Sequence, residues 1–125
     1  FHLTSTASLE KLDNYDFFCS FIVLQHNPPP IIAYTIKEVL NKLNREGIAI
    51  FQVPTYMKGY KFSSDEYLSN SKKIGMEMHC IPQSAVIKIA SECGCDVLEI
   101  REDNWIGNRK NWISNTFILK KRNVT

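Results

Sequence analysis

The first half of the chain holds two apolar segments in which hydrophobic residues do not alternate with polar ones, at positions 15–24 and 48–53. Such strands are typical of parallel sheets, where both faces are covered. Between them, apolar residues recur at the spacing of one helix face: Ile32, Ile36, Val39, Leu40 and Leu43. The pattern therefore predicts a right-handed β-α-β crossover over residues 15–56.

The expected helix carries signals at both of its ends. Asn27 is a favourable N-cap, and the prolines at 28–30 suit the first turn, where an N–H group would have no helical partner. Gly47 can adopt the left-handed conformation that ends many helices. We therefore expect Gly47 to end the helix and the second strand to begin at Ile48.

The remainder of the chain predicts a long loop, a helix and a β-hairpin. Residues 57–81 mix aromatic and polar positions without a clear period, which suits a loop with a short helix at 64–69. Pro82 opens a second amphipathic helix. Strands at 95–101 and 112–120 are expected to pair antiparallel. The chain thus forms one domain, 1–125, with an irregular lead-in at 1–14, the β-α-β unit at 15–56, the long loop at 57–81, and the helix and hairpin at 82–122.

Composition places the chain among globular proteins of one domain. Its 125 residues are 44% hydrophobic and 22% charged. The net charge of +2 is too small to indicate a nucleic-acid partner, and no apolar run is long enough to suggest a membrane helix. The sequence shows no secretion leader. It opens at Phe1 without an initiator Met, from which we expect these residues to be part of a longer polypeptide.

The four cysteines predict neither a disulfide framework nor a metal site. Cys19 lies inside an apolar strand, where a free thiol behaves as a small hydrophobic residue. Cys93 and Cys95 are separated by one glycine, a spacing that fits neither zinc ligands nor a redox dithiol. Together with Cys80 they are expected to stay reduced, which indicates a cytoplasmic setting.

Four groups of residues occur in an order that resembles an enzyme family. Tyr15-Asp16 is followed by a run from Ser20 to His26 that ends in Leu-Gln-His; 44–48 follows the expected helix, and 51–54 reads Phe-Gln-Val-Pro. With the closing pair of strands, this order resembles the C-terminal half of class I S-adenosylmethionine-dependent methyltransferases. The resemblance implies the family's fourth to seventh strands, in a partial Rossmann-like α/β sheet that is mostly parallel with a C-terminal antiparallel hairpin.

The glycines of this chain depart from the family pattern. The family binds its methyl donor, S-adenosylmethionine, mainly through a Gly-rich turn that lets backbone amides approach the donor closely. Here the five glycines are scattered at 47, 59, 75, 94 and 107. The resemblance therefore implies a methyltransferase fragment that binds S-adenosylmethionine poorly and is inactive alone. When complete, it would transfer a methyl group to a small-molecule or sugar-linked acceptor.

The resemblance also implies where the donor and the acceptor bind. Ligands of open α/β sheets bind outside the carboxyl ends of the parallel strands. Carried over to this chain, the family pattern places Ser20 and Gln25 beside the donor, and Gln52 and Tyr56 toward the acceptor.

Three further residues suit acid-base catalysis. Histidine is the side chain that most often serves as a general base, so His26 could take this role; alternatively, it hydrogen-bonds the turn or caps the helix start. Glu77 and His79 lie two residues apart on the segment that leads into the second helix. They could form an acid-base pair over the strand ends; alternatively, they belong to an ordinary loop surface. Without further ligands nearby they do not predict a metal site.

The first strand predicts a partner protein as well. In the family the fourth strand pairs with the first, so residues 15–24 would form an apolar edge here, which natural proteins rarely leave bare. We therefore expect a homodimer that covers this edge. A second functional hypothesis is a non-catalytic module of the same ancestry that serves assembly or substrate capture. A flavodoxin-like or nucleotide-binding half would require a phosphate-binding turn, and the sequence shows none.

Overall fold

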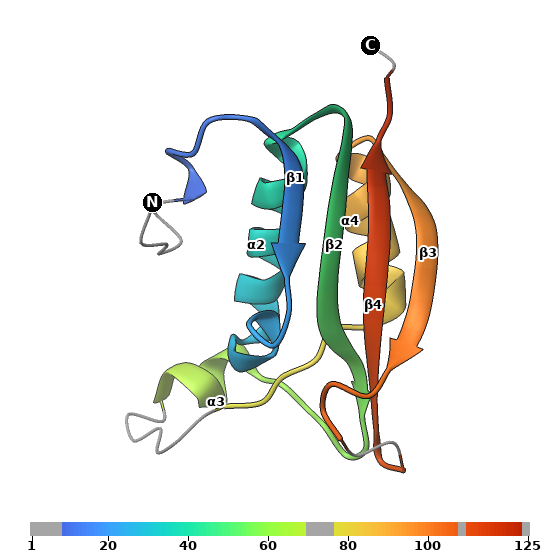
Figure 1. Cartoon of the computed structure of the whole chain (residues 1–125). Helices are drawn as coiled ribbons and strands as arrows, with labels where there is room; N and C mark the ends of the chain where they lie inside the picture. Colours follow the sequence, from blue (N-terminus) through green and yellow to red (C-terminus); the bar gives the residue numbers. More distant parts are fainter. Residues whose placement is uncertain (1–8, 70–76, 108–109, 124–125) are drawn as a thin grey trace.

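One mixed four-stranded sheet forms the centre of the computed structural model, which describes residues 9–69, 77–107 and 110–123. Along the chain, the elements are β1 (Tyr15–Ser20), the 3-10 turn η1 (Leu24–His26), α2 (Pro29–Asn41), β2 (Leu43–Met57), α3 (Ser64–Ser69), α4 (Gln83–Glu92), β3 (Cys95–Asp103) and β4 (Trp112–Lys121). Figure 1 shows α2 and α4 on one face of the sheet. No helix within the described ranges is long and apolar enough to cross a membrane.

The strand directions confirm the predicted β-α-β crossover. β1 pairs in parallel with β2, with Phe18 beside Ala49 and Ser20 beside Phe51. β4 runs antiparallel to both β2 and β3, and the sheet order is β1-β2-β4-β3. Three of the four strands therefore point the same way, as expected for a mostly parallel α/β sheet that closes with an antiparallel hairpin.

The core lies between the sheet and the two long helices. Phe51 of β2 and Phe117 of β4 are fully buried and stack with ring centroids 5.4 Å apart. Five helix side chains of the same cluster are at most 1% exposed: Ile32, Ile36, Leu40, Val86 and Ala90. On the opposite face of β2, Ile48 and Ile50 remain partly exposed. Within the described ranges, helices thus cover one face of the sheet rather than the two faces that we expected.

β1 is shorter than the apolar run that predicts it, because it ends at Ser20 and not at Leu24. Ile22 adopts a positive φ of 58°, which turns the chain out of the sheet. Leu24 then folds back into the core, where it is 3% exposed. Of this turn only Leu24 is buried, whereas Ile22 and Val23 are 43% and 56% exposed. An apolar run alone does not distinguish such a turn from a strand.

The junction between α2 and β2 also differs from the prediction. α2 ends at Asn41, and β2 begins at Leu43 rather than at Ile48. Gly47 is not a helix cap but lies inside β2, at an irregularity in the pairing with β1. A Cβ on Gly47 would lie 2.7 Å from the carbonyl oxygen of Asn44. Close packing, and not a left-handed conformation, therefore requires the glycine.

The starts of the helices follow the prediction with one exception. The prolines fill the first turn of α2, but Pro28 occupies its N-cap, and Asn27 instead donates its side-chain amide to the Val23 carbonyl at 3.2 Å. α3 spans the predicted residues 64–69, and α4 begins directly after Pro82. The lead-in predicted at 1–14 is described only from Leu9 onward.

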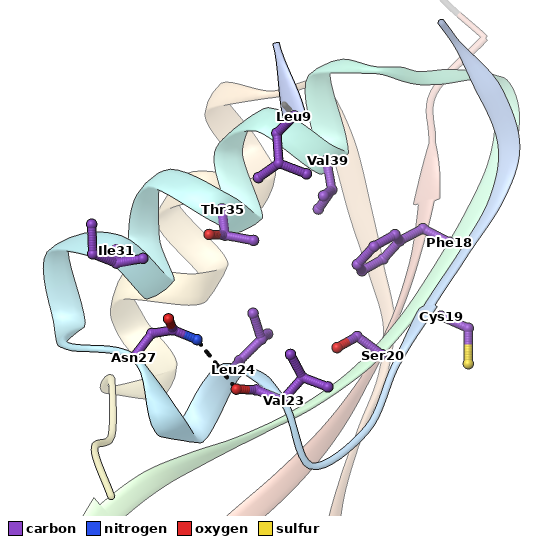
Figure 2. Close-up of a pocket in the computed structure, with 10 residues that line it drawn as sticks. All are labelled: Leu9, Phe18, Cys19, Ser20, Val23, Leu24, Asn27, Ile31, Thr35 and Val39. Atoms are coloured by element: carbon purple, nitrogen blue, oxygen red, sulfur yellow. Dashed lines mark hydrogen bonds between the residues drawn. The ribbon is translucent and has the colours of Figure 1, made fainter. Parts of the chain in front are cut away.

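The cysteines are free thiols in two different environments. Cys80, Cys93 and Cys95 are buried, and burial raises the pKa of each thiol. Cys19, which we expected to behave as a small core residue, is exposed. The reason is the alternation of side chains along β1: Phe18 packs against the core, whereas the next side chain, that of Cys19, points away from α2 (Figure 2).

Candidate functional site

Three chain segments meet at the carboxyl ends of β1 and β2: η1, the end of β2, and residues 77–81, which lead into α4 (Figure 1). The backbone N–H of His79 donates to the Gln25 carbonyl at 2.7 Å, which joins the first segment to the third. His26 and Glu77, far apart in the sequence, are thereby brought together. They lie at the edge where open α/β sheets bind ligands.

Gln52 is fully buried at the centre of a polar network in this region. Its Nε2 donates to Oε1 of Gln25 at 2.9 Å and to the Ser114 hydroxyl at 2.8 Å. Its Oε1 accepts a hydrogen bond from the Ile22 N–H at 2.8 Å. These bonds tie the turn after β1 to β2 and β4. Because every buried side-chain nitrogen and oxygen in the described residues has a partner, the network is complete.

His79 is held through both of its ring nitrogens and is 8% exposed. Its Nδ1 lies 2.7 Å from the Tyr60 hydroxyl, and its Nε2 lies 3.2 Å from Oε1 of Glu77. Tyr67 donates to the other carboxylate oxygen of Glu77 at 3.1 Å. An ionised carboxylate only accepts, so Nε2 of the neutral ring carries the proton and Nδ1 accepts from Tyr60. The four side chains therefore form one chain of hydrogen bonds, the His79 relay (Tyr60, His79, Glu77 and Tyr67).

Aromatic rings surround the imidazole of His79. The ring centroids of Tyr60, Phe62 and Tyr67 lie 5.9, 6.0 and 5.9 Å from it, all in steep, edge-type arrangements. Burial raises the pKa of Tyr60 to about 12, so this phenol keeps its proton at neutral pH. Tyr60 is therefore a hydrogen-bond donor to His79 under ordinary conditions, in agreement with the proton positions assigned above.

His26 is anchored to Glu77 through a backbone atom. Its Nδ1 lies 2.9 Å from the carbonyl oxygen of Glu77. A carbonyl oxygen only accepts, so Nδ1 carries the proton, and Nε2 of the neutral ring keeps a lone pair that can take up a proton. The hydrogen bond thus selects the tautomer that a general base requires. In the described part of the chain, no group of three or more His, Cys, Asp or Glu side chains could hold a metal ion.

A separate pocket lies between β1 and α2 (Figure 2). Its volume is about 320 Å³, and the residues that line it are Leu9, Phe18, Cys19, Ser20, Val23, Leu24, Asn27, Ile31, Thr35 and Val39. The Ser20 hydroxyl points into the pocket, whereas the Cys19 sulfur points away from it. The lining is mostly apolar, with Ser20, Asn27 and Thr35 as its polar side chains.

We call this pocket between β1 and α2 the β1 pocket. It contains Ser20, which the family pattern places beside the donor, but its residues do not form a donor site. S-adenosylmethionine carries a carboxylate, an ammonium and a sulfonium group, and buried charges require partners. None of the residues that line the pocket is charged, and none is a glycine that would allow close backbone approach. The residues of this pocket therefore do not hold S-adenosylmethionine by themselves.

The structure gathers most of the predicted site residues into two adjoining clusters: Gln25 with Gln52, and His26 with Glu77 and His79. Ser20 lies instead in the β1 pocket, and Tyr56 is 50% exposed near the end of β2.

Sequence reasoning missed three members of these clusters, which are Tyr60, Tyr67 and Ser114. The density of aromatic residues at 56–67, within a segment read as a loop, was the signal that could have identified the two tyrosines. Nothing in the sequence pattern singles out Ser114, because its role depends on the pairing of β2 with β4.

Comparison with solved structures places the fold among methyltransferases, although no family model and no curated protein sequence matches this chain. TehB from Haemophilus influenzae matches with a TM-score of 0.64 and 16% identity, over 97% of this chain and 40% of that one. Magnesium protoporphyrin IX methyltransferase (ChlM) from Synechocystis PCC 6803, with bound SAH, matches with a TM-score of 0.59 and 14% identity, over 90% and 48%.

A third match, a SAM-dependent methyltransferase from Methanosarcina mazei, has a TM-score of 0.59 and 15% identity, over 88% of this chain and 60% of that one. The chain therefore has a class I methyltransferase fold. It spans between 40% and 60% of the length of these three structures.

Proposed function

We propose that residues 1–125 are the C-terminal portion of an S-adenosylmethionine-dependent methyltransferase. The complete enzyme transfers a methyl group to a small-molecule or sugar-linked acceptor, and residues 1–125 alone are inactive. Three observations support the proposal. The chain has the fold of methyltransferases but spans only part of the length of the similar structures. In addition, no charged residue and no glycine lines the β1 pocket. Residues before Phe1 would then supply the Gly-rich, donor-binding turn.

The orientation of His26 is the observation that carries a catalytic role. With Nδ1 held by the Glu77 carbonyl at 2.9 Å, Nε2 is the basic atom at the carboxyl end of β1. A hydroxyl or amine of the acceptor that gives its proton to Nε2 becomes a stronger nucleophile. His79 and the Glu77 side chain act as positioning residues, because the His79 relay fixes the segment whose carbonyl orients His26.

The remaining site residues divide between binding and positioning. Ser20 contributes its hydroxyl to the donor side, in the β1 pocket, and the half-exposed Tyr56 faces the acceptor. Gln25 and Gln52 are nearly or completely buried, and the Gln52 amide is engaged by three partners. Their contribution is to hold the turn that leads from β1 into His26.

A methyl-transfer assay on the complete native protein tests this function, with labelled S-adenosylmethionine and a panel of hydroxyl and amine acceptors. The variant His26→Gln keeps a hydrogen-bonding side chain but removes the base, so kcat should fall by about 100-fold or more while donor affinity is retained. Lys88→Gln, on the exposed side of α4, serves as the matched control. Unchanged turnover of His26→Gln would remove His26 from the mechanism.

Calorimetry tests the second part of the proposal, that residues 1–125 are inactive alone. Titration of this chain with S-adenosylmethionine should release no heat of specific binding, because the β1 pocket offers no charged partner. Micromolar binding would show that these residues contain a complete donor site, and the fragment interpretation would then be abandoned.

A non-catalytic module for assembly or substrate capture is the alternative function. It is favoured by the His79 relay, whose hydrogen bonds are satisfied within the chain, as in a purely structural cluster. A complete protein that binds an acceptor but transfers no methyl group to any member of the panel would support this alternative.

The exposed edge of the sheet supports a homodimer as the assembly of this chain. Among the described residues, β1 is the last strand on its side of the sheet, and Phe17 in it is 58% exposed. A second copy that covers β1 would bury this apolar edge. The free thiols agree with a cytoplasmic protein, which is the location that we propose.

A further inference from the structure

A small apolar pocket lies between the first turn of α2 and the short helix α3. Its volume is about 230 Å³, and the residues that line it are Pro28, Pro30, Ile31, Phe62, Ser64, Tyr67 and Leu68. None of them is charged, and four of the seven are prolines or aromatic residues. We call this site the proline pocket.

The start of α2 differs from most helix starts because it has no N–H group to offer a ligand. Helix N-termini commonly bind anions through the free N–H groups of their first turn. Here Pro29 and Pro30 have no N–H, and the N–H groups of Ile31 and Ile32 both donate to the Pro28 carbonyl, at 2.9 and 3.0 Å. A phosphate or carboxylate in the proline pocket would therefore find no backbone donor at the helix start.

The proline pocket shares its aromatic wall with the site of His26. The Tyr67 ring lines the pocket, while its hydroxyl donates to Glu77 at 3.1 Å. The carbonyl of the same Glu77 accepts from His26 at 2.9 Å. Phe62 likewise lines the pocket and lies 6.0 Å from the imidazole of His79, measured between ring centroids. Pro28 follows His26 by two residues, so the chain itself connects the two places.

We propose that the proline pocket binds an uncharged aromatic ring of the methyl acceptor. The inference rests on the proposed function, since it assigns this ring to the molecule whose proton His26 removes. Aromatic rings gain edge-to-face contacts with Phe62 and Tyr67 in addition to the burial of apolar area. A charged or sugar-phosphate group would lose its hydration without gaining a charged partner among the described residues that line the pocket.

Nuclear magnetic resonance titration of residues 1–125 tests the inference with two probes that share one ring system. 1-Naphthol should shift the amide signals of Ser64, Tyr67 and Leu68, whereas 1-naphthyl phosphate should bind at least about tenfold more weakly. Equal affinity for the two probes would overturn the inference. So would shifts that cluster around the β1 pocket, or no binding of 1-naphthol at all.

A pair of leucine variants localises the binding. Leu68 is 79% exposed and Leu98, on β3 and outside the pocket lining, is 56% exposed, so neither substitution removes core packing. Leu68→Asp should weaken 1-naphthol binding by about tenfold or more, because it places a charge at the pocket. Leu98→Asp should leave the affinity unchanged. Equal effects of both variants would count against the proline pocket.

The inference and the proposed function can fail separately. Residues 1–125 could bind 1-naphthol specifically while the complete protein transfers no methyl group. This result would support the aromatic-ring site and contradict the proposed methyltransferase function. Conversely, the complete protein could transfer methyl groups only to acceptors without an aromatic ring, with no binding of 1-naphthol. This result would support the proposed methyltransferase function and contradict the aromatic-ring site.

Discussion

Ile22 and Gln52 are joined by a hydrogen bond between the turn after β1 and the middle of β2, in which the Ile22 N–H donates to Oε1 of Gln52 at 2.8 Å. Ile22 has a φ of 58°. This conformation costs a non-glycine residue on the order of 1–3 kcal/mol and persists only where the surrounding structure holds it. The hydrogen bond to Gln52 keeps Ile22 in this conformation. The turn leads directly into η1, which contains His26.

Replacement of Gln52 by leucine is therefore expected to loosen this turn. The variant Gln52→Leu leaves the Ile22 N–H and the Gln25 amide oxygen without a partner, and it should lower the free energy of unfolding by about 2–3 kcal/mol. The amide proton of Ile22 should also exchange faster with solvent. Urea unfolding and hydrogen exchange measure the two effects.

A second glutamine provides the control for Gln52. Gln83 makes one side-chain hydrogen bond, to Asn115 at 2.8 Å, but it lies at the exposed start of α4. Gln83→Leu should therefore cost less than about 1 kcal/mol. If the two variants were equally stable, the network around Gln52 would not be what fixes the turn.

Two glycines are expected to respond to alanine for different reasons. A Cβ on Gly47 would meet the Asn44 carbonyl oxygen at 2.7 Å and the Leu43 side chain at 2.8 Å, so Gly47→Ala should cost about 2–3 kcal/mol through overpacking. Gly59 has a φ of +74° with open space around its Cβ position, so Gly59→Ala should cost only about 1 kcal/mol, for the left-handed backbone. Chemical denaturation measures both, and the reverse order would contradict this account.

The sequence predicted the sheet well because periodicity and strand hydrophobicity report on burial. The parallel pairing of β1 with β2 and the final hairpin both follow the pattern of apolar residues. The errors occur where burial and secondary structure separate. Leu24 is buried in a turn, and Gly47 is demanded by contacts within β2 rather than by a helix end. Neither the burial of Leu24 nor the close contacts at Gly47 can be read from the neighbouring residues in the sequence.

The candidate site was only partly predictable, for a related reason. His26 and the Glu77–His79 pair were identified because their side chains can exchange protons and because they flank the ends of expected elements. Their joining through the Glu77 carbonyl depends on how residues 77–81 cross η1. Tyr60 and Tyr67 were missed because a phenol in a loop becomes part of a relay only when the fold brings it to His79 or Glu77.

Tyr60 is expected to make the stability of the protein depend on pH in the alkaline range. Its pKa is raised from 10.0 to about 12 by burial, so the folded protein holds this proton more tightly than the unfolded chain does. The resulting stabilisation is fully present below pH 10 and is lost as the pH rises through 12. Tyr60→Phe should therefore flatten the fall in stability between these limits.

The same variant has a separate effect at neutral pH. Tyr60→Phe removes the donor to Nδ1 of His79 and should cost about 1 kcal/mol there. Tyr15, whose pKa burial also raises to about 12, provides the comparison, since Tyr15→Phe should flatten the alkaline fall without altering the His79 ring signals. Urea unfolding over a pH series measures both variants. An alkaline slope identical to that of the unmodified protein would show that Tyr60 titrates alike in the folded and unfolded states.

The two edge strands of the sheet offer a matched test of the proposed homodimer. Phe17 on β1 and Leu98 on β3 are 58% and 56% exposed, and they lie at opposite edges. A lysine on an edge strand opposes strand-to-strand association, because its charge would have to be buried. Phe17→Lys should therefore raise the dimer dissociation constant by about tenfold or more, whereas Leu98→Lys should leave it unchanged. Light scattering over a concentration series distinguishes the outcomes, and an unmodified chain that is monomeric at every concentration would exclude the dimer.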